Sequence, residues 1–256
     1  MAYSPKNAAK TAWIIGASSG IGRALALRLV KDGYRVAVSA RRREVLEALS
    51  REAEGQILAF PLDICDRDAV HRVTGEVRSA LGSIALVVQA AGTYQRDTPS
   101  RFDAKAMRQM VDLNLMGTAH CLEALVPLMR ADGGGQISLV GSVSGYAGLP
   151  GGGAYGATKS ALITLAEAIH PELVRHGIHV SVINPGFVET PLTAANDFPM
   201  PFMISAENAA ERIVAGLKKG RFEIAFPKRM VFALKLLRLL PYPLFFALTQ
   251  RMLRQG

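Results

Sequence analysis

The sequence has little cysteine, and its two cysteines match no metal-ligand spacing. Cys65 and Cys121 lie far apart in the chain, so we expect no metal site and interpret both as small buried side chains in a reducing compartment. The first ten residues also lack the apolar stretch of a secretory signal. This predicts a cytoplasmic location, with the inner membrane surface as the alternative for a chain that contacts membrane.

Acidic residues are fewer than basic ones, 21 against 30, which leaves a net charge of +9. Such a surplus raises the question of a nucleic-acid partner. The arginines are scattered, however, and the chain has neither zinc-finger spacing nor a basic stripe interleaved with aromatic residues. These absences argue against nucleic-acid binding.

No internal repeat or low-complexity linker interrupts the 256 residues, which indicates one domain over residues 1–256. Short apolar runs alternate with longer amphipathic stretches, as in strand-helix units that build a parallel sheet. Strands are expected at Thr11–Gly16, Arg35–Ala40, Gln56–Phe60, Ala85–Ala90, Gln136–Gly141, His179–Asn184 and Phe222–Ala225. Helices are expected to begin near Gly20, Arg43, Asp66, Asp103, Gly153 and Ala206. The predicted fold is α/β, a doubly wound parallel sheet of about seven strands with helices on both faces.

A glycine-rich turn joins the first expected strand to the first helix. It reads Gly16-Ala17-Ser18-Ser19-Gly20-Ile21-Gly22. Glycines let a backbone turn tightly and approach a pyrophosphate, whose charge is held by amide N–H groups and the positive end of the helix. By itself the motif also fits an ordinary loop that caps a helix. In this context it predicts a Rossmann-like dinucleotide site formed by Gly16, Ser18, Ser19, Gly20, Ile21 and Gly22.

The second expected strand ends in arginines rather than in an acidic residue. An acidic side chain here would bind a free ribose 2′-hydroxyl, whereas a guanidinium suits a 2′-phosphate. Arg41 and Arg42 occupy this place, at a helix N-terminus where cations are otherwise unfavourable. The sequence therefore favours NADP(H) over NAD(H).

Three polar residues follow the fifth expected strand. Ser142 ends that strand, and Tyr155 and Lys159 lie four residues apart on one face of the next helix. A nearby ammonium favours phenolate and so lowers a tyrosine pKa toward neutrality. Such a tyrosine exchanges protons at working pH, while Ser142 orients the substrate oxygen. The pattern predicts an oxidoreductase that transfers hydride between NADP(H) and a carbonyl or alcohol, with Tyr155 as general acid or base.

Taken in order, these motifs resemble those of the short-chain dehydrogenase/reductase family in its single-domain form. The matches extend over about Thr11 to Pro191 and also include Ala91-Gly92, Asn114, and Asn184-Pro185-Gly186 with Thr190. The resemblance implies that Asn114 anchors a water in a proton relay. It also implies that Lys159 bonds the nicotinamide ribose and lowers the pKa of Tyr155. Further cofactor contacts are implied for Asp63, Ile64, Ala91, Gly92, Pro185, Gly186, Val188 and Thr190.

Two positions depart from the family pattern. Ile15 stands where the family usually has threonine before the first glycine of the turn. Gln89-Ala90-Ala91-Gly92 stands where it usually has Asn-Ala-Gly or Asn-Asn-Ala-Gly. Each change removes a side-chain hydrogen bond, which predicts a looser turn and a lower cofactor affinity or local stability.

The segment after Thr190 is mostly apolar and matches the family's mobile substrate loop. Aromatic residues and methionine adapt to irregular apolar ligands, so we expect a hydrophobic ketone, aldehyde or secondary alcohol as substrate. The alternative is that these side chains only pack the loop onto the domain. The expected substrate contacts are Ser144, Tyr146, Leu149, Phe187, Leu192, Phe198 and Phe202.

Two rival functions fit part of the pattern. The first is a catalytically idle NADP(H)-binding sensor or scaffold protein, which would not need Asn114, Ser142, Tyr155 and Lys159 together. The second is a nucleotide-sugar epimerase of the related extended family, which would need a larger C-terminal substrate domain than this length provides. Hydride transfer accounts for more of the motifs than either.

Two long helices carry the expectation about assembly. The stretches Asp103–Arg130 and Gly153–His176 match the helices through which family members pair. The resemblance therefore implies a homodimer or a homotetramer.

The C-terminal tail, Phe222–Gly256, is an extension that is both basic and strongly apolar. Lys235 and Arg238 interrupt its apolar run, and Pro241 and Pro243 are expected to break any helix, so no membrane-spanning segment is expected. Two short amphipathic helices are expected at Lys228–Leu240 and Leu244–Arg254. They fit peripheral contact with an anionic membrane, and equally packing on a neighbouring subunit or over the substrate pocket.

Overall fold

The computed structural model describes residues 10–96, 100, 102–194, 196 and 198–253. Its sheet has seven parallel strands in the order β3-β2-β1-β4-β5-β6-β7. The strands are β1 Thr11–Ile15, β2 Arg35–Ser39, β3 Ile57–Ala59, β4 Leu86–Gln89, β5 Gly135–Val140, β6 Ile178–Pro185 and β7 Glu223–Phe226. After β3 the chain returns to the other side of β1, which confirms the doubly wound α/β fold predicted from sequence.

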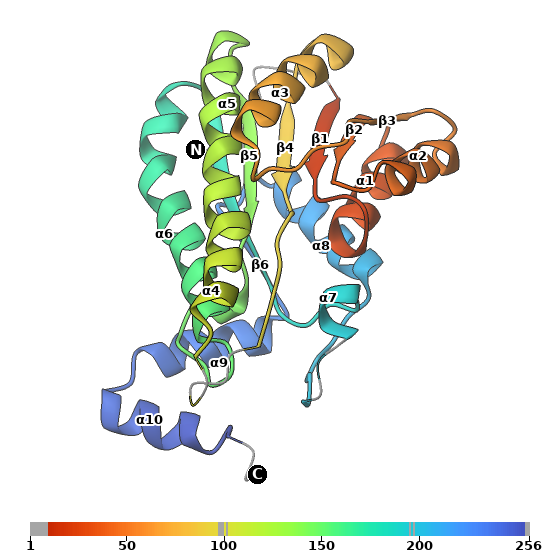
Figure 1. Ribbon diagram of the computed structural model, residues 1–256. Helices are drawn as coiled ribbons and strands as arrows, with labels where there is room; N and C mark the ends of the chain where they lie inside the picture. The colour runs from red at the N-terminus through yellow and green to blue at the C-terminus, as the bar shows by residue number, and fades with distance from the viewer. Residues whose placement is uncertain (1–9, 97–99, 101, 195, 197, 254–256) are drawn as a thin grey trace.

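Helices cover both faces of this sheet (Figure 1). One apolar cluster joins the sheet to α1, α2 and α8, and a second joins the other face to α3, α5 and α6. Successive strand residues alternate between the two: Ile14 belongs to the first cluster, and Trp13 and Ile15 to the second. Strands buried on both faces must be apolar throughout, which explains the continuous runs in the sequence.

The helices begin close to the residues expected from the sequence. Two of the beginnings are fixed by side-chain caps, because the Asp66 carboxylate accepts a hydrogen bond from the Ala69 N–H and the Asp103 carboxylate accepts from two amides. The helices are α1 Gly20–Lys31, α2 Arg43–Glu52, α3 Arg67–Leu81, α4 Ala104–Met110, α5 Gly117–Ala131, α6 Gly153–Arg175, α7 Pro191–Ala194, α8 Ala206–Lys218, α9 Lys228–Arg238 and α10 Tyr242–Gln250.

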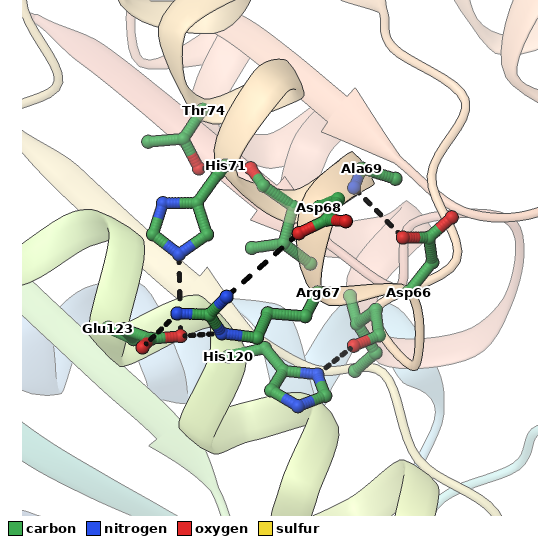
Figure 2. Close-up of polar contacts among 10 residues, drawn as sticks. Asp66, Arg67, Asp68, Ala69, His71, Thr74, His120 and Glu123 are labelled. Carbon is green, nitrogen blue, oxygen red and sulfur yellow. Dashed lines mark hydrogen bonds and ion pairs between the residues drawn. The ribbon is translucent and has the colours of Figure 1, made fainter.

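Polar contacts hold α3 against α5 beside the loop that follows β3 (Figure 2). Arg67 donates two hydrogen bonds to Glu123, at 2.8 and 2.7 Å, and His71 lies 3.3 Å from the same carboxylate. These two hydrogen bonds lower the pKa of Glu123 to about 2. One turn earlier on α5, the His120 Nδ1 donates to the Ile64 carbonyl oxygen over 3.0 Å. This bond ties the loop after β3, which carries Ile64, to α5.

The tail begins inside the sheet and leaves it only after β7. α9 and α10 match the two expected helices, but α10 begins at Tyr242 rather than Leu244. The expectation that Pro243 breaks the helix is wrong, because this residue lies in the first turn, where proline lacks only an N–H that would be unpaired anyway. Among the helices of the described residues, none is long and apolar enough to cross a membrane.

The two cysteines differ in their surroundings. Cys121 is buried, as expected, and burial raises the pKa of its thiol to about 12. Cys65 is exposed, so the expectation of a buried side chain is wrong there. It lies in the loop between β3 and α3, where its backbone N–H donates to the Asp63 carboxylate.

Candidate functional site

A cavity of about 1230 Å³ lies at the carboxyl ends of the strands. This volume exceeds the roughly 300–1,000 Å³ of pockets for single small ligands. Every residue that the sequence analysis assigned to cofactor binding lines the cavity, and so do Ser142, Tyr155 and Lys159. Asn114 lies fully buried beside it. The parallel sheet brings these residues together because all the strands end at one edge.

The turn after β1 requires its glycines. Gly16 has a φ of +92°, and a Cβ there would lie 2.3 Å from the backbone nitrogen of Ala91. A Cβ on Gly22 would lie 2.3 Å from the carbonyl oxygen of Gly16. Backbone atoms cannot move aside as a flexible side chain can, so only glycine permits this close approach of β1, β4 and α1.

The first turn of α1 is suited to bind a phosphate group. Its N-cap, Ser19, makes no side-chain capping bond, and Ser18 to Gly22 all line the cavity. The first amides of a helix have no partner within the helix and carry its positive dipole end. Arg42 reaches over from the end of β2 and donates a hydrogen bond to the Ser18 hydroxyl over 3.1 Å. An anion held by this turn would therefore lie close to a guanidinium group, so these residues fit a phosphorylated dinucleotide.

The departure at Ile15 is accommodated by burial. Ile15 is 1% exposed and packs in the second apolar cluster, so it contributes to the core instead of a hydrogen bond. The Gly16 and Ala17 amides both bond to the Ser39 carbonyl oxygen, at 2.7 and 3.2 Å. The turn is thus fastened to β2 through its backbone rather than through a side chain at position 15.

Tyr155, Ser142 and Lys159 meet at the start of α6. Ser142 follows β5, and its Oγ accepts a hydrogen bond from the Ser144 N–H over 3.1 Å. The Ser142 hydroxyl donates to the Pro185 carbonyl oxygen over 3.5 Å, and it lies close enough to the Tyr155 side chain to lower the pKa of the phenol. The Lys159 ammonium lies 5.6 Å from the centre of the Tyr155 ring and donates to the Val140 carbonyl oxygen over 2.9 Å. A hydroxyl, a phenol and an ammonium therefore share one wall of the cavity.

The protonation of this group differs from the expectation. Burial raises the pKa of Tyr155 to about 12, against the lowering effect of the Ser142 hydrogen bond, and burial lowers the pKa of Lys159 to about 8. The expected lowering of the tyrosine pKa by the ammonium does not appear, because desolvation acts on both groups and Lys159 bonds to a carbonyl oxygen instead of the phenol.

Asn114 lies in a π-helical turn, η2 Val111–Met116, between α4 and α5. Its amide oxygen accepts from the Thr93 N–H over 2.8 Å, and its amide nitrogen donates to the Thr93 carbonyl over 2.9 Å and to Thr158 over 3.1 Å. Asn114 thus joins the end of β4 to the first turn of α6. A buried side-chain amide needs such partners, and Asn114 finds all of them within the protein.

Gln89 takes part in the same network, although the sequence presented it only as a departure. Its amide donates to the Thr118 hydroxyl over 2.5 Å, and that hydroxyl donates to the Asn114 carbonyl over 2.7 Å. Neither Gln89 nor Thr118 was identified from the sequence, because the hydrogen bond between them joins β4 to α5.

Five of the seven expected substrate residues line the cavity, and two do not. Those present are Ser144, Leu149, Phe187, Leu192 and Phe198. Tyr146 points away, because its hydroxyl donates to Glu223 over 2.7 Å and its ring lies under the Lys235 ammonium at 5.1 Å. Phe202 is half exposed and lies outside the lining. The sequence placed both on nearby loops but had no information on the direction of their side chains.

The structure adds lining residues that sequence analysis had not assigned. Tyr94 packs edge-on against Tyr155, with ring centres 5.0 Å apart. The tail contributes Met230, Leu234, Met252 and Leu253. The sequence did contain a signal for Tyr94, because this residue closely follows Ala91-Gly92 after a strand end, where ligands bind in such a sheet. The contribution of the tail agrees with one of the roles left open for it, covering the substrate pocket.

Metal chemistry has no ligand set here. In the part of the chain that the structure describes, no group of three or more His, Cys, Asp or Glu side chains is arranged to hold a metal ion.

Comparisons with known proteins agree with this arrangement. Residues 10–198 match the family described as short chain dehydrogenase. An uncharacterized oxidoreductase of Myxococcus xanthus is 36% identical over 246 residues, 95% of this chain and 97% of the relative. A Burkholderia cenocepacia short chain dehydrogenase in complex with NADP has a similar fold, with a TM-score of 0.82 at 23% identity over 94% of this chain and 97% of that one. A Burkholderia phymatum short chain dehydrogenase/reductase in complex with NAD has the same TM-score, 0.82, at 21% identity over 89% and 92% of the two chains. The chain therefore belongs to the short-chain dehydrogenase/reductase family of oxidoreductases.

Proposed function

We propose that this protein transfers hydride between NADP(H) and a hydrophobic ketone, aldehyde or secondary alcohol, with Tyr155 as the general acid or base. The observation that carries the proposal is the position of the Tyr155 phenol beside Ser142 in a cavity that also contains the glycine-rich turn. A proton donor and a dinucleotide cradle in one cavity are what a carbonyl reduction needs.

Each side chain has a separate task in the proposed reaction. When bound, the cofactor supplies or takes up the hydride at the substrate carbon. The Tyr155 hydroxyl gives its proton to the carbonyl oxygen during reduction and takes it back during oxidation. Ser142 donates a hydrogen bond to the same oxygen and so holds it near the phenol. Lys159, whose ammonium lies 5.6 Å from the centre of the Tyr155 ring, binds the nicotinamide ribose from the same wall of the cavity.

Asn114 has a positioning task in this proposal. It ties the Thr93 backbone to Thr158, next to the first turn of α6 that carries Tyr155. We propose that it also anchors a water through which the proton from Lys159 and Tyr155 is exchanged with solvent. The π-helical turn around Asn114 supports such a task, because these turns occur frequently at functional sites.

Replacement of the phenol tests the proposed chemistry. Tyr155→Phe should lower turnover at least about a hundredfold, because a general acid contributes about 10²- to 10⁴-fold. The dissociation constant of NADPH should stay nearly unchanged. The rate of NADPH oxidation with a panel of hydrophobic carbonyls measures turnover, and fluorescence titration measures the dissociation constant of NADPH. Tyr34→Phe is the matched control, because Tyr34 lies just before β2, at the end of the sheet opposite the cavity. Most of the activity remaining in Tyr155→Phe would refute the role of the phenol.

The preference for NADP(H) over NAD(H) rests on Arg41 and Arg42. Both line the cavity at the end of β2, and Arg42 extends toward the turn that is suited to bind phosphate. A 2′-phosphate on the adenosine ribose would give these guanidinium groups an anion to pair with. The structures of related fold include one with NADP and one with NAD. The proposed preference for NADP(H) therefore rests on the two arginines and not on the fold.

The proposed substrate is hydrophobic because the part of the cavity beyond Tyr155 is largely apolar. Leu149, Phe187, Leu192 and Phe198 form part of this wall, and Phe187 and Phe198 pack edge to face with ring centres 5.9 Å apart. Apolar walls with a few directed polar groups favour a substrate whose only polar part is the reacting oxygen.

A homodimer or homotetramer is part of the same proposal. The family pairs through the helices that correspond to α5 and α6. Exposed apolar side chains lie at both helices in this protein: Met116 just before α5, and Val174 on α6. Static light scattering at micromolar concentration should give two or four times the mass of the chain. A single-chain mass at that concentration would refute the assembly.

A further inference from the structure

The two tail helices expose more apolar surface than the rest of the chain. Among the described residues, 15 large hydrophobic side chains are exposed, and nine of these lie between Phe232 and Leu253. The three most exposed of the tail are Leu239 at 80%, Phe232 at 71% and Tyr242 at 63%. Exposed apolar side chains gathered in one segment in this way indicate a site of contact rather than a surface that faces water.

The same segment carries only positive charge. The last acidic residue of the chain is Glu223, and the 33 residues after it contain Lys228, Arg229, Lys235, Arg238, Arg251 and Arg254. The stretch 239–250 between them is free of charge. Arg229, Arg238 and Arg251 are exposed in the structure. An uncharged apolar stretch with cations at both ends is complementary to an apolar layer with an anionic surface.

This surface adjoins the mouth of the cavity. Met230 and Leu234 of α9 line the cavity from within. Met252 and Leu253, after α10, also line it, although each is more than half exposed. In Figure 1, α9 and α10 lie together at the lower end of the molecule, the end toward which the chain runs after β4. A ligand that enters past Met252 and Leu253 therefore passes over the apolar surface of the tail.

The tail is seated firmly enough to present this surface. Val231, Leu234, Leu237 and Phe245 are buried in a third apolar cluster with Val143. Lys235 of α9 also donates to Glu223 at the start of β7 over 2.5 Å. One face of α9 is thus fixed to the body, and the opposite face remains exposed.

We propose that α9, α10 and the residues up to Leu253 dock on an anionic lipid bilayer, so that the cavity opens at the membrane surface. The apolar side chains enter the boundary between headgroups and acyl chains, and the cations contact the anionic headgroups. The 11-residue α9 is about 16 Å long, about half of the hydrocarbon thickness, so it lies along the surface. The docking itself does not depend on the proposed function. The further statement that the substrates are carbonyl compounds dissolved in the lipid does rest on the proposed function.

A second copy of this chain is a less suitable occupant. A two-fold interface brings the same surface of each copy against itself. The cations of the tail would then lie opposite the same cations of the other copy, and residues 224–256 contain no acidic side chain to pair with them. A lipid surface provides the missing negative charge.

Flotation with vesicles tests the docking with the full-length protein. At low salt, the protein should float with vesicles of phosphatidylcholine and phosphatidylglycerol. It should float much less with phosphatidylcholine alone, and less with the anionic vesicles at high salt, because salt screens the surface charge. No flotation with the anionic vesicles at low salt would overturn the proposal.

Paired variants show whether the tail is responsible. In Arg229→Glu/Arg238→Glu, vesicle affinity should fall at least about 25-fold, since each cation near an anionic surface contributes about 1 kcal/mol, or fivefold. Arg51→Glu/Arg212→Glu makes the same charge change on α2 and α8 and should retain most of the affinity. Equal losses in the two pairs would show that net charge alone drives binding, and would overturn the proposal.

Apolar variants separate a membrane from a subunit interface. Leu239→Ser and Phe246→Ser, both at exposed positions, should weaken flotation without changing the mass measured by light scattering. A fall in mass, together with no flotation of the unaltered protein, would assign the surface to a second copy instead. NADPH oxidation with a water-soluble carbonyl, measured without vesicles, should be unchanged in these variants. Loss of docking and loss of catalysis are therefore observed separately.

Discussion

The buried Lys159 is expected to reduce the stability of the protein in the absence of cofactor. Its side chain is buried at the edge of the cavity, and burial lowers its pKa from 10.5 to about 8. A difference of this size corresponds to about 3 kcal/mol at neutral pH, because each pKa unit is worth about 1.4 kcal/mol. Lys159→Met keeps the length of the side chain and removes the charge. It also removes the hydrogen bond to the Val140 carbonyl, worth about 1 kcal/mol.

The net expectation is that Lys159→Met is about 2 kcal/mol more stable than the unaltered protein at pH 7. For a chain of this size that corresponds to a rise in Tm of about 4–8 °C. The difference should shrink above pH 8. There the folded lysine releases its proton while the unfolded one keeps it up to about pH 10.5, so the stability of the unaltered protein rises with pH. The same variant should have no activity and a weaker affinity for NADPH.

Thermal and urea unfolding at pH 7 and pH 10, without added cofactor, measure these differences. Lys219→Met, an exposed position at the end of α8, is the control and should change stability by less than about 0.5 kcal/mol. The reasoning is refuted if Lys159→Met is the less stable protein at pH 7, or if its advantage is as large at pH 10.

Three further substitutions test other parts of the structure. Gly16→Ala should lower the free energy of unfolding by more than about 2 kcal/mol and abolish NADPH binding, because its Cβ would meet the Ala91 backbone at 2.3 Å. Gly75→Ala, at a helix position with open space around it, should instead raise the free energy of unfolding by about 0.5–1 kcal/mol. Urea unfolding measures both changes. Arg41→Ala/Arg42→Ala should lower the NADPH to NADH ratio of kcat/KM tenfold or more, and an unchanged ratio would remove the basis for the cofactor preference. Glu223→Gln should destabilise by about 1 kcal/mol at pH 7: burial opposes the charge, yet hydrogen bonds from Lys235 and Tyr146 lower the pKa of Glu223. The contribution is therefore present above about pH 4.3 and lost as the pH falls through the lowered pKa, so a deficit that persists at pH 3 would contradict this account.

The sequence by itself determined the elements that depend on local pattern. Strands buried on both faces must be continuous apolar runs, which made β1 to β7 recognisable to within two residues. The glycine-rich turn is also a local property, because Gly16 needs a positive φ whatever surrounds it. The spacing of Tyr155 and Lys159 on one helix face follows from the helical repeat.

Only the tertiary structure decided the direction of side chains and the partners that come from distant segments. Tyr146 lies within four residues of Ser142, yet it turns to Glu223 because β7 and α9 pack against that side. Gln89 reaches Thr118, and through it Asn114, by a hydrogen bond between β4 and α5 that no spacing reveals. The pKa of Tyr155 rises instead of falling because burial, a property of the whole fold, outweighs the local helix spacing. The tail meets the cavity for the same reason: Met252 lies almost a hundred residues after Tyr155 in the sequence, and only the packing of α9 and α10 brings it to the mouth.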